Sequence, residues 1–280
     1  MKAYLKLVHM EVHRFRYLLG GLMALTILMQ FGVVLLWSLS ERSIRTSPGW
    51  SEQLVTYHPF SETGKLTFSE LMYSNQFWFF FPVLISIIVI AAYVFLIWYR
   101  DWLGRDTFIY RLLMLPGNRS SIYAAKLTAI LLFTFGLVSF QLLLLPLEMM
   151  LFNLIIPEGL RDLSYLSQAI LQNQALTILL PGRLDAFIMA YAIGILAVLA
   201  VFTIILLERS YRFIGMGYAV IYVFVCGAAL LAPIILQRPG NAASYLYPGE
   251  TYSIMLALTV ILVVASVWLS IRLLNKKITV

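Results

Sequence analysis

Long apolar runs alternate with shorter polar segments along the whole chain. A helix needs roughly 20 apolar residues to cross the hydrocarbon core of a bilayer. The pattern therefore predicts six membrane-spanning helices, over residues 18–39, 79–98, 122–145, 184–207, 214–236 and 254–273. A further apolar piece follows Pro146 as far as Ile156, so the third helix either kinks at the proline or continues along the outer interface.

The polar segments between these runs predict smaller elements. Residues 1–17 have an apolar and a cationic face at helical spacing, which is typical of an amphipathic helix lying in the headgroup plane. Residues 40–78 are predicted to be an extracellular segment, too short to form a packed domain of its own. Residues 153–182 alternate leucines with polar residues, so we expect them to be partly helical on the outer surface.

Composition excludes a soluble protein. Of the 280 residues, 61% are hydrophobic and 12% are charged, whereas soluble domains are about half apolar and a quarter charged. We therefore expect an all-α integral membrane protein, with a single transmembrane domain over residues 1–280. The lone Cys226 lies in an apolar run, which leaves no disulfide framework and no thiolate metal site.

The distribution of basic residues sets the orientation. The net charge of +7 does not indicate a nucleic-acid partner, because the basic residues follow the membrane topology. With the N-terminus inside, fourteen of the 20 lysine and arginine residues fall on the cytoplasmic side. The sequence therefore predicts that both termini are cytoplasmic, in a multi-pass protein of a bacterial cytoplasmic membrane.

Catalytic and ligand-binding motifs are missing from the sequence. Gly64-Lys65 lacks the glycine spacing of a phosphate-binding loop, and His9 and His13 lack further metal ligands nearby. We therefore expect no catalytic residues, no cofactor and no metal in this chain. Gln141 and Glu148 are the candidate intramembrane polar residues; we interpret Glu148, just past Pro146, as an interfacial, solvated carboxylate.

The densest group of cations lies between the second and third runs, in a segment that we call the polar bridge (residues 99–126). Within it, residues 107–115 have the composition of a short helix, and Pro116-Gly117 is a stop signal. Ile109, Leu112 and Leu113 give that helix an apolar stripe. On spacing alone, an ordinary basic loop is the simpler interpretation.

The polar bridge also resembles the loop between the second and third spans of type-2 ABC exporter permeases. That loop commonly carries an acidic residue, a Gly-Thr pair, leucines, a Leu-Pro-x-x-Arg motif, an isoleucine and a lysine. The matching positions here are Asp101 or Asp106, Gly104, Thr107, Leu112-Leu113, Leu115-Pro116, Arg119, Ile122 and Lys126. The match departs from the family in two ways. Gly104 and Thr107 are not adjacent, and a short segment stands where the family has outer helices between spans five and six.

The resemblance implies a permease that forms half of an export pathway. Residues 100–121 would hold a cytoplasmic coupling helix that docks on separate ABC ATPase subunits, which bind ATP and magnesium and hydrolyse the ATP. A second permease subunit, identical or paralogous, would complete the pathway. The residues implied in coupling are Arg105, Thr107, Ile109, Arg111, Leu112, Leu113, Pro116 and Arg119.

Two other functions stay open. A sensory or immunity subunit would bind an envelope-active antimicrobial peptide on its outer segments without transporting it. A stand-alone intramembrane enzyme or secondary carrier is disfavoured by the lack of paired carboxylates and broken-helix repeats.

Overall fold

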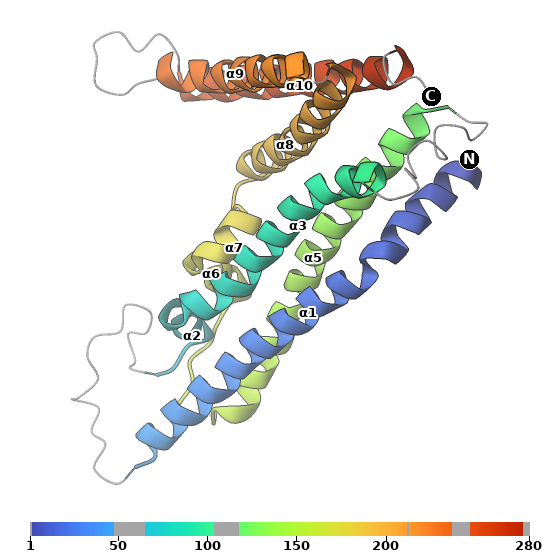
Figure 1. Cartoon of the computed structure of the whole chain (residues 1–280). Coiled ribbons are helices and arrows are strands. Elements are labelled where there is room, and N and C mark those ends of the chain that lie inside the picture. Colours follow the sequence, from blue (N-terminus) through green and yellow to red (C-terminus); the bar gives the residue numbers. More distant parts are fainter. Residues whose placement is uncertain (1, 48–64, 104–117, 212, 237–246, 277–280) are drawn as a thin grey trace. The chain divides into compact units, whose positions relative to one another are not determined.

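A computed structural model describes residues 2–47, 65–103, 118–211, 213–236 and 247–276 (Figure 1). Six helices within these ranges are long and apolar enough to cross a membrane. They are α1 (Lys2–Arg45), α3 (Gln76–Leu103), α5 (Ser120–Ile155), α8 (Leu184–Tyr211), α9 (Phe213–Leu236) and α10 (Pro248–Lys276). Each contains one of the six predicted spans. By length and composition, the prediction of a helical multi-pass membrane protein is confirmed.

All six helices are longer than the apolar runs that predicted them, and α1 and α5 exceed theirs by the most residues. α1 is continuous over 44 residues and does not end at Tyr17, so the segment predicted as a separate amphipathic helix forms the first turns of α1. The first proline of the chain is Pro48, and no residue before it forces a break. α5 likewise continues through Pro146 to Ile155.

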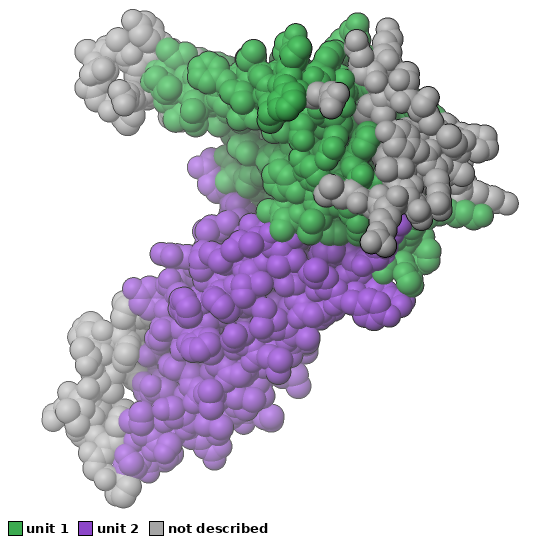
Figure 2. Space-filling model, viewed as in Figure 1, with its two compact units in different colours: residues 1–13, 91–131, 185–280 green, residues 14–90, 132–184 purple. Residues whose placement is uncertain are grey.

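The chain forms two compact units (Figure 2). Unit 1 contains residues 1–13, 91–131 and 185–280, and unit 2 contains residues 14–90 and 132–184. The helices α1, α3 and α5 contribute residues to both units. The helices α8, α9 and α10 belong to unit 1, apart from Leu184, the first residue of α8, which belongs to unit 2.

Unit 2 contains three short helices, which we call the helical cap: α2 (Phe68–Ser74), α6 (Leu166–Gln172) and α7 (Gln174–Leu179). Local sequence explains where two of them begin. The Thr67 hydroxyl accepts a hydrogen bond from the Glu70 amide at 3.2 Å and starts α2. The Asn173 side chain accepts from two amides of α7, at 3.1 and 3.3 Å, and starts α7.

At the helical cap, two segments that are far apart in the sequence, around residues 66 and 161, come together. Leu66 donates to the carbonyl of Leu160 and accepts from the amide of Asp162, both at 2.9 Å. Phe68 and Phe152 are fully buried in the core that results, which also contains Leu71, Met72, Leu145, Ile156, Ala169 and Leu176. Residues 153–182 are partly helical, as predicted. Residues 66–72 pack against residues that are far from them in the sequence.

Unit 1 is held together by aromatic and hydroxyl contacts. The rings of Trp98, Tyr123 and Phe202 pack with centroids 5.5 to 6.4 Å apart and join α3, α5 and α8. Hydroxyl pairs add contacts to α10, with Thr203 bonded to Ser270 at 3.0 Å. Such polar contacts matter in a membrane bundle, because lipid tails are as apolar as the helix surfaces and the hydrophobic effect between helices is lost.

Candidate functional site

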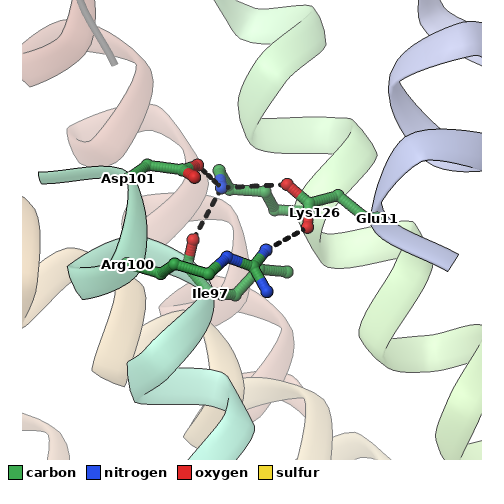
Figure 3. A network of polar contacts seen from close by, with 5 residues as sticks. All are labelled: Glu11, Ile97, Arg100, Asp101 and Lys126. Atoms are coloured by element: carbon green, nitrogen blue, oxygen red, sulfur yellow. Dashed lines mark hydrogen bonds and ion pairs between the residues drawn. The ribbon is translucent and has the colours of Figure 1, made fainter. Parts of the chain in front are cut away.

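Four charged side chains from three helices meet in unit 1, and we call them the charged cluster (Figure 3). Glu11 comes from the third turn of α1, Arg100 and Asp101 from the last turn of α3, and Lys126 from the second turn of α5. Arg100 and Asp101 directly precede residues 104–117, and Lys126 follows them. The charged cluster therefore joins the two ends of the polar bridge.

Lys126 is the centre of the charged cluster. Its Nζ atom donates to a carboxylate oxygen of Asp101, to Oε1 of Glu11 at 3.2 Å and to the backbone carbonyl of Ile97 at 2.7 Å. The second carboxylate oxygen of Glu11 accepts from the Arg100 guanidinium at 2.8 Å. One ammonium group thus connects α1, α3 and α5.

Most of the side chains in these ion pairs are buried, so breaking a pair would destabilise the packing of the helices. Glu11, Asp101 and Lys126 are no more than 2% exposed, whereas the Arg100 side chain is 38% exposed. The four side chains carry two negative and two positive charges, so the cluster is balanced. A buried charge is tolerated only when it is paired and hydrogen-bonded, and removing one partner of such a pair is strongly destabilising. The three helices are therefore held together wherever this cluster is intact.

Aromatic rings surround the charges. The Lys126 ammonium lies 5.2 Å from the centroid of the buried Trp98 ring, and the Arg100 guanidinium lies 5.9 Å from that of Tyr93. A cation over an aromatic face is attracted by the ring quadrupole, more so where water is excluded. The rings thus add attraction for both cations and keep water from Lys126.

A second set of contacts fixes α8 to the end of α3. The Tyr99 hydroxyl donates to Glu208 of α8 at 2.5 Å. The Arg209 guanidinium lies over the rings of Tyr99 and Trp102, 5.3 and 5.5 Å from their centroids. A hydroxyl-to-carboxylate bond is charge-assisted and stronger than a neutral one, so α8 is joined to α3 beside the charged cluster.

Most residues implied in coupling lie outside the described residues: Arg105, Thr107, Ile109, Arg111, Leu112, Leu113 and Pro116. Arg119 is described, and its guanidinium donates to the carbonyl of Leu274 near the end of α10 at 3.1 Å. The structure therefore describes the two ends of the polar bridge, where Arg119 contacts α10 and Lys126 joins the charged cluster.

The two candidate intramembrane polar residues lie in unit 2. Gln141 of α5 forms a reciprocal amide pair with Gln30 of α1, with N–O distances of 3.0 and 3.2 Å. The interpretation of Glu148 as a solvated carboxylate is wrong, because its side chain is fully buried. Neither of its oxygens has a hydrogen-bond partner among the described residues. It was misread because its position past Pro146 was taken as the end of the helix, whereas α5 continues to Ile155 and the helical cap covers this region.

Glu11 is the member of the charged cluster that sequence reasoning missed. A signal was present, because Glu11 follows Val8 by three residues and precedes the buried Phe15 by four. That spacing places the carboxylate on the apolar face of the helix and away from the cationic face. An acid within an apolar stripe requires a buried cation, and Lys126 supplies it.

Comparison of the chain with family models, with curated proteins and with solved structures gave no match. The function is therefore inferred from the chain's own residues.

Proposed function

We propose that this chain is the membrane-spanning permease subunit of an ATP-driven ABC exporter, with both termini in the cytoplasm. In this proposal the polar bridge docks on a separate ATPase subunit, which binds ATP and magnesium and hydrolyses the ATP. Two such permease subunits, identical or paralogous, form the translocation pathway in a bacterial cytoplasmic membrane.

The observation that carries the proposal is the anchoring of the polar bridge at both of its ends. Asp101 near its start and Lys126 at its end form a buried ion pair, and Glu11 adds α1 to the same pair. Separating α3 from α5 at this point would expose or unpair buried charges, which costs several kcal/mol. A displacement that reaches either end of the polar bridge would therefore move α1, α3 and α5 together.

This anchoring is what a coupling element requires. An ATPase that changes its conformation acts on the permease only through the residues that it touches, and a loosely attached loop would dissipate that movement. The apolar stripe of Ile109, Leu112 and Leu113 supplies a surface for docking, and the arginines around it supply orientation. The charged cluster supplies the connection from that surface to three spans.

Purification of the complex tests this proposal. The tagged chain would be expressed with the ABC ATPase encoded beside it and solubilised in mild detergent. We expect the native chain to retain the ATPase and the Leu112→Asp/Leu113→Asp double variant to lose it. Leu163→Asp is the matched control, because it adds an acid at a leucine that is 84% exposed and outside the polar bridge. Equal retention by all three chains, or by none, contradicts the proposal, provided that all insert into the membrane equally.

The helical cap favours a second candidate, a sensory or immunity subunit for envelope-active peptides. Two separate segments fold onto one core there, which gives a rigid surface on which a peptide could be recognised without transport. The two functions differ in their need for ATP. A partner ATPase that binds but does not hydrolyse ATP should abolish export of the cargo, whereas it should leave peptide binding by the chain unchanged.

A further inference from the structure

Two exposed arginines each lie over an exposed aromatic ring, and we call them the arginine–aromatic pairs. In α1 the Arg16 guanidinium lies 4.5 Å from the centroid of the Tyr17 ring and donates to the Tyr17 hydroxyl at 2.6 Å. In α10 the Arg272 guanidinium lies 5.1 Å from the centroid of the Trp268 ring. Tyr17 is 76% exposed and Trp268 is 59% exposed, so both pairs lie on the surface of the chain.

The arginine–aromatic pairs differ from the cation–ring contacts of the charged cluster. There, the carboxylate of Glu11 neutralises both Arg100 and Lys126. Among the described residues, no acidic side chain forms an ion pair with Arg16 or Arg272. Each of these two guanidinium groups therefore presents its charge and its N–H donors to a partner outside the described chain.

Both pairs lie where a predicted span meets its polar flank. Arg16 precedes the apolar run of residues 18–39 by two positions, which is about 3 Å along a helix, and Arg272 is the last residue but one of the run 254–273. Tyrosine and tryptophan are enriched at this depth, because their rings lie among the lipid headgroups. In the proposed orientation these are headgroups of the cytoplasmic leaflet, which carries anionic lipids.

The pair in α1 has room for a lipid beside it. Gly20 follows Arg16 by four residues and therefore lies on the same face of the helix. It is exposed, and a Cβ at this position would meet no atom within 4 Å. The glycerol and the acyl chains of a lipid have open space there. Since the Tyr17 oxygen accepts from Arg16, its own hydrogen remains to be donated.

We propose that each arginine–aromatic pair binds the phosphate of an anionic phospholipid. The guanidinium fork donates to two phosphate oxygens, which is the geometry that makes arginine the preferred partner of phosphate. The aromatic ring lies at the level of the glycerol, and the acyl chains follow the span. A zwitterionic lipid binds less well, because its choline cation offsets the phosphate charge. This inference needs no ATPase, so it goes beyond the proposed function.

Native mass spectrometry of the purified full chain tests the proposal. The chain in mild detergent would be titrated with phosphatidylglycerol, or with phosphatidylcholine of the same acyl chains, and the bound lipids would be counted. The attraction of one basic residue for an anionic leaflet predicts that phosphatidylglycerol binds each pair about fivefold more tightly. Arg16→Gln and Arg272→Gln should each remove one of the tighter sites, and the double variant should bind the two lipids equally. Both arginines are exposed, so these variants should fold.

Two further variants of α1 separate a built site from general attraction. Lys6→Gln removes an exposed charge that lies ten residues, or about 15 Å, from Arg16 and should leave the affinity for phosphatidylglycerol unchanged. Gly20→Leu keeps every charge, but its side chain covers the turn that holds Arg16, so it should weaken the site in α1.

Three results would overturn the proposal. Native affinity in the Arg16→Gln/Arg272→Gln double variant would show that the pairs do not hold the lipid. An equal loss in Lys6→Gln would show that binding follows the net charge of the chain. Competition by inorganic phosphate at the concentration of the lipid would show that the pairs take a soluble anion and not a headgroup.

Discussion

Methionine in place of Lys126 fills about the same space as the lysine stem but has no charge and no donor. In the native chain the ammonium contacts Glu11, Asp101 and the carbonyl of Ile97, and it lies over the ring of Trp98. The variant leaves two carboxylates without this cation in a site where both are about 2% exposed. We expect a large loss of stability.

The size of the loss can be estimated from the burial. Removing one partner of a buried ion pair costs about 3 to 5 kcal/mol, because the remaining charge stays buried and uncompensated. Arg100→Met should cost less, about 1.5 kcal/mol or below, since the Arg100 side chain is 38% exposed and Glu11 keeps its bond to Lys126. Lys126→Met should therefore lower the free energy of unfolding by more than Arg100→Met does.

The assay is the free energy of unfolding in mixed micelles, measured by titrating sodium dodecyl sulfate and following tryptophan fluorescence. Lys6→Met is the matched control, because Lys6 is an exposed lysine of α1. The triple variant Lys126→Met/Glu11→Gln/Asp101→Asn removes the charges together and should recover at least half of the lost stability. A Lys126→Met loss no larger than that of Lys6→Met, or no recovery in the triple variant, would refute the reasoning.

Three further predictions concern other contacts. Gln30→Leu should cost about 1 to 3 kcal/mol because it strands the Gln141 amide, and the double variant Gln30→Leu/Gln141→Leu should recover most of it in the same titration. Glu148→Leu should raise the thermal unfolding temperature, since it replaces a buried carboxyl that lacks a described partner; a lower temperature would show that the carboxyl is satisfied by a bound group. Gly215→Ala should destabilise the chain by about 1 to 3 kcal/mol, because a Cβ there would overlap a backbone carbonyl of α8, whereas Gly217→Ala has open space and should be nearly neutral in the same assay.

The six long helices could be predicted because the bilayer imposes a length and a composition on each of them. The ends of those helices could not be predicted in the same way. The apolar residues end at the boundary of the hydrocarbon core, whereas the backbone hydrogen bonds of the helix continue beyond it. α1 therefore extends over the residues predicted as a separate interfacial helix, and α5 extends beyond Pro146. The same error affects Glu148, because a residue just past Pro146 was expected to be solvated at the membrane interface, whereas its side chain is fully buried.

The helical cap and the charged cluster could not be predicted from the sequence, for a different reason. Thr67 and Asn173 carry the local signals that start α2 and α7, but nothing local indicates that residues 66 and 161 pair side by side. In the same way, the sequence identifies Lys126 only as the lysine at the end of the polar bridge. Its burial against Glu11 joins residues 115 positions apart, and such pairings depend on the packing of the whole bundle.

Polar contacts of unequal strength join the helices of unit 1. Buried charges join α1, α3 and α5, and the contacts of Glu208 and Arg209 join α8 to α3. The bonds from α8 and α9 to α10 are hydroxyl pairs, and neutral bonds of this kind average roughly 0.6 kcal/mol in a membrane protein. Arg119, just before α5, makes a stronger, charge-assisted bond to the carbonyl of Leu274 near the end of α10. In an exporter, we therefore expect a force applied at the polar bridge to reach α10 through Arg119, and the hydroxyl pairs from α8 and α9 to rearrange before the buried ion pairs separate.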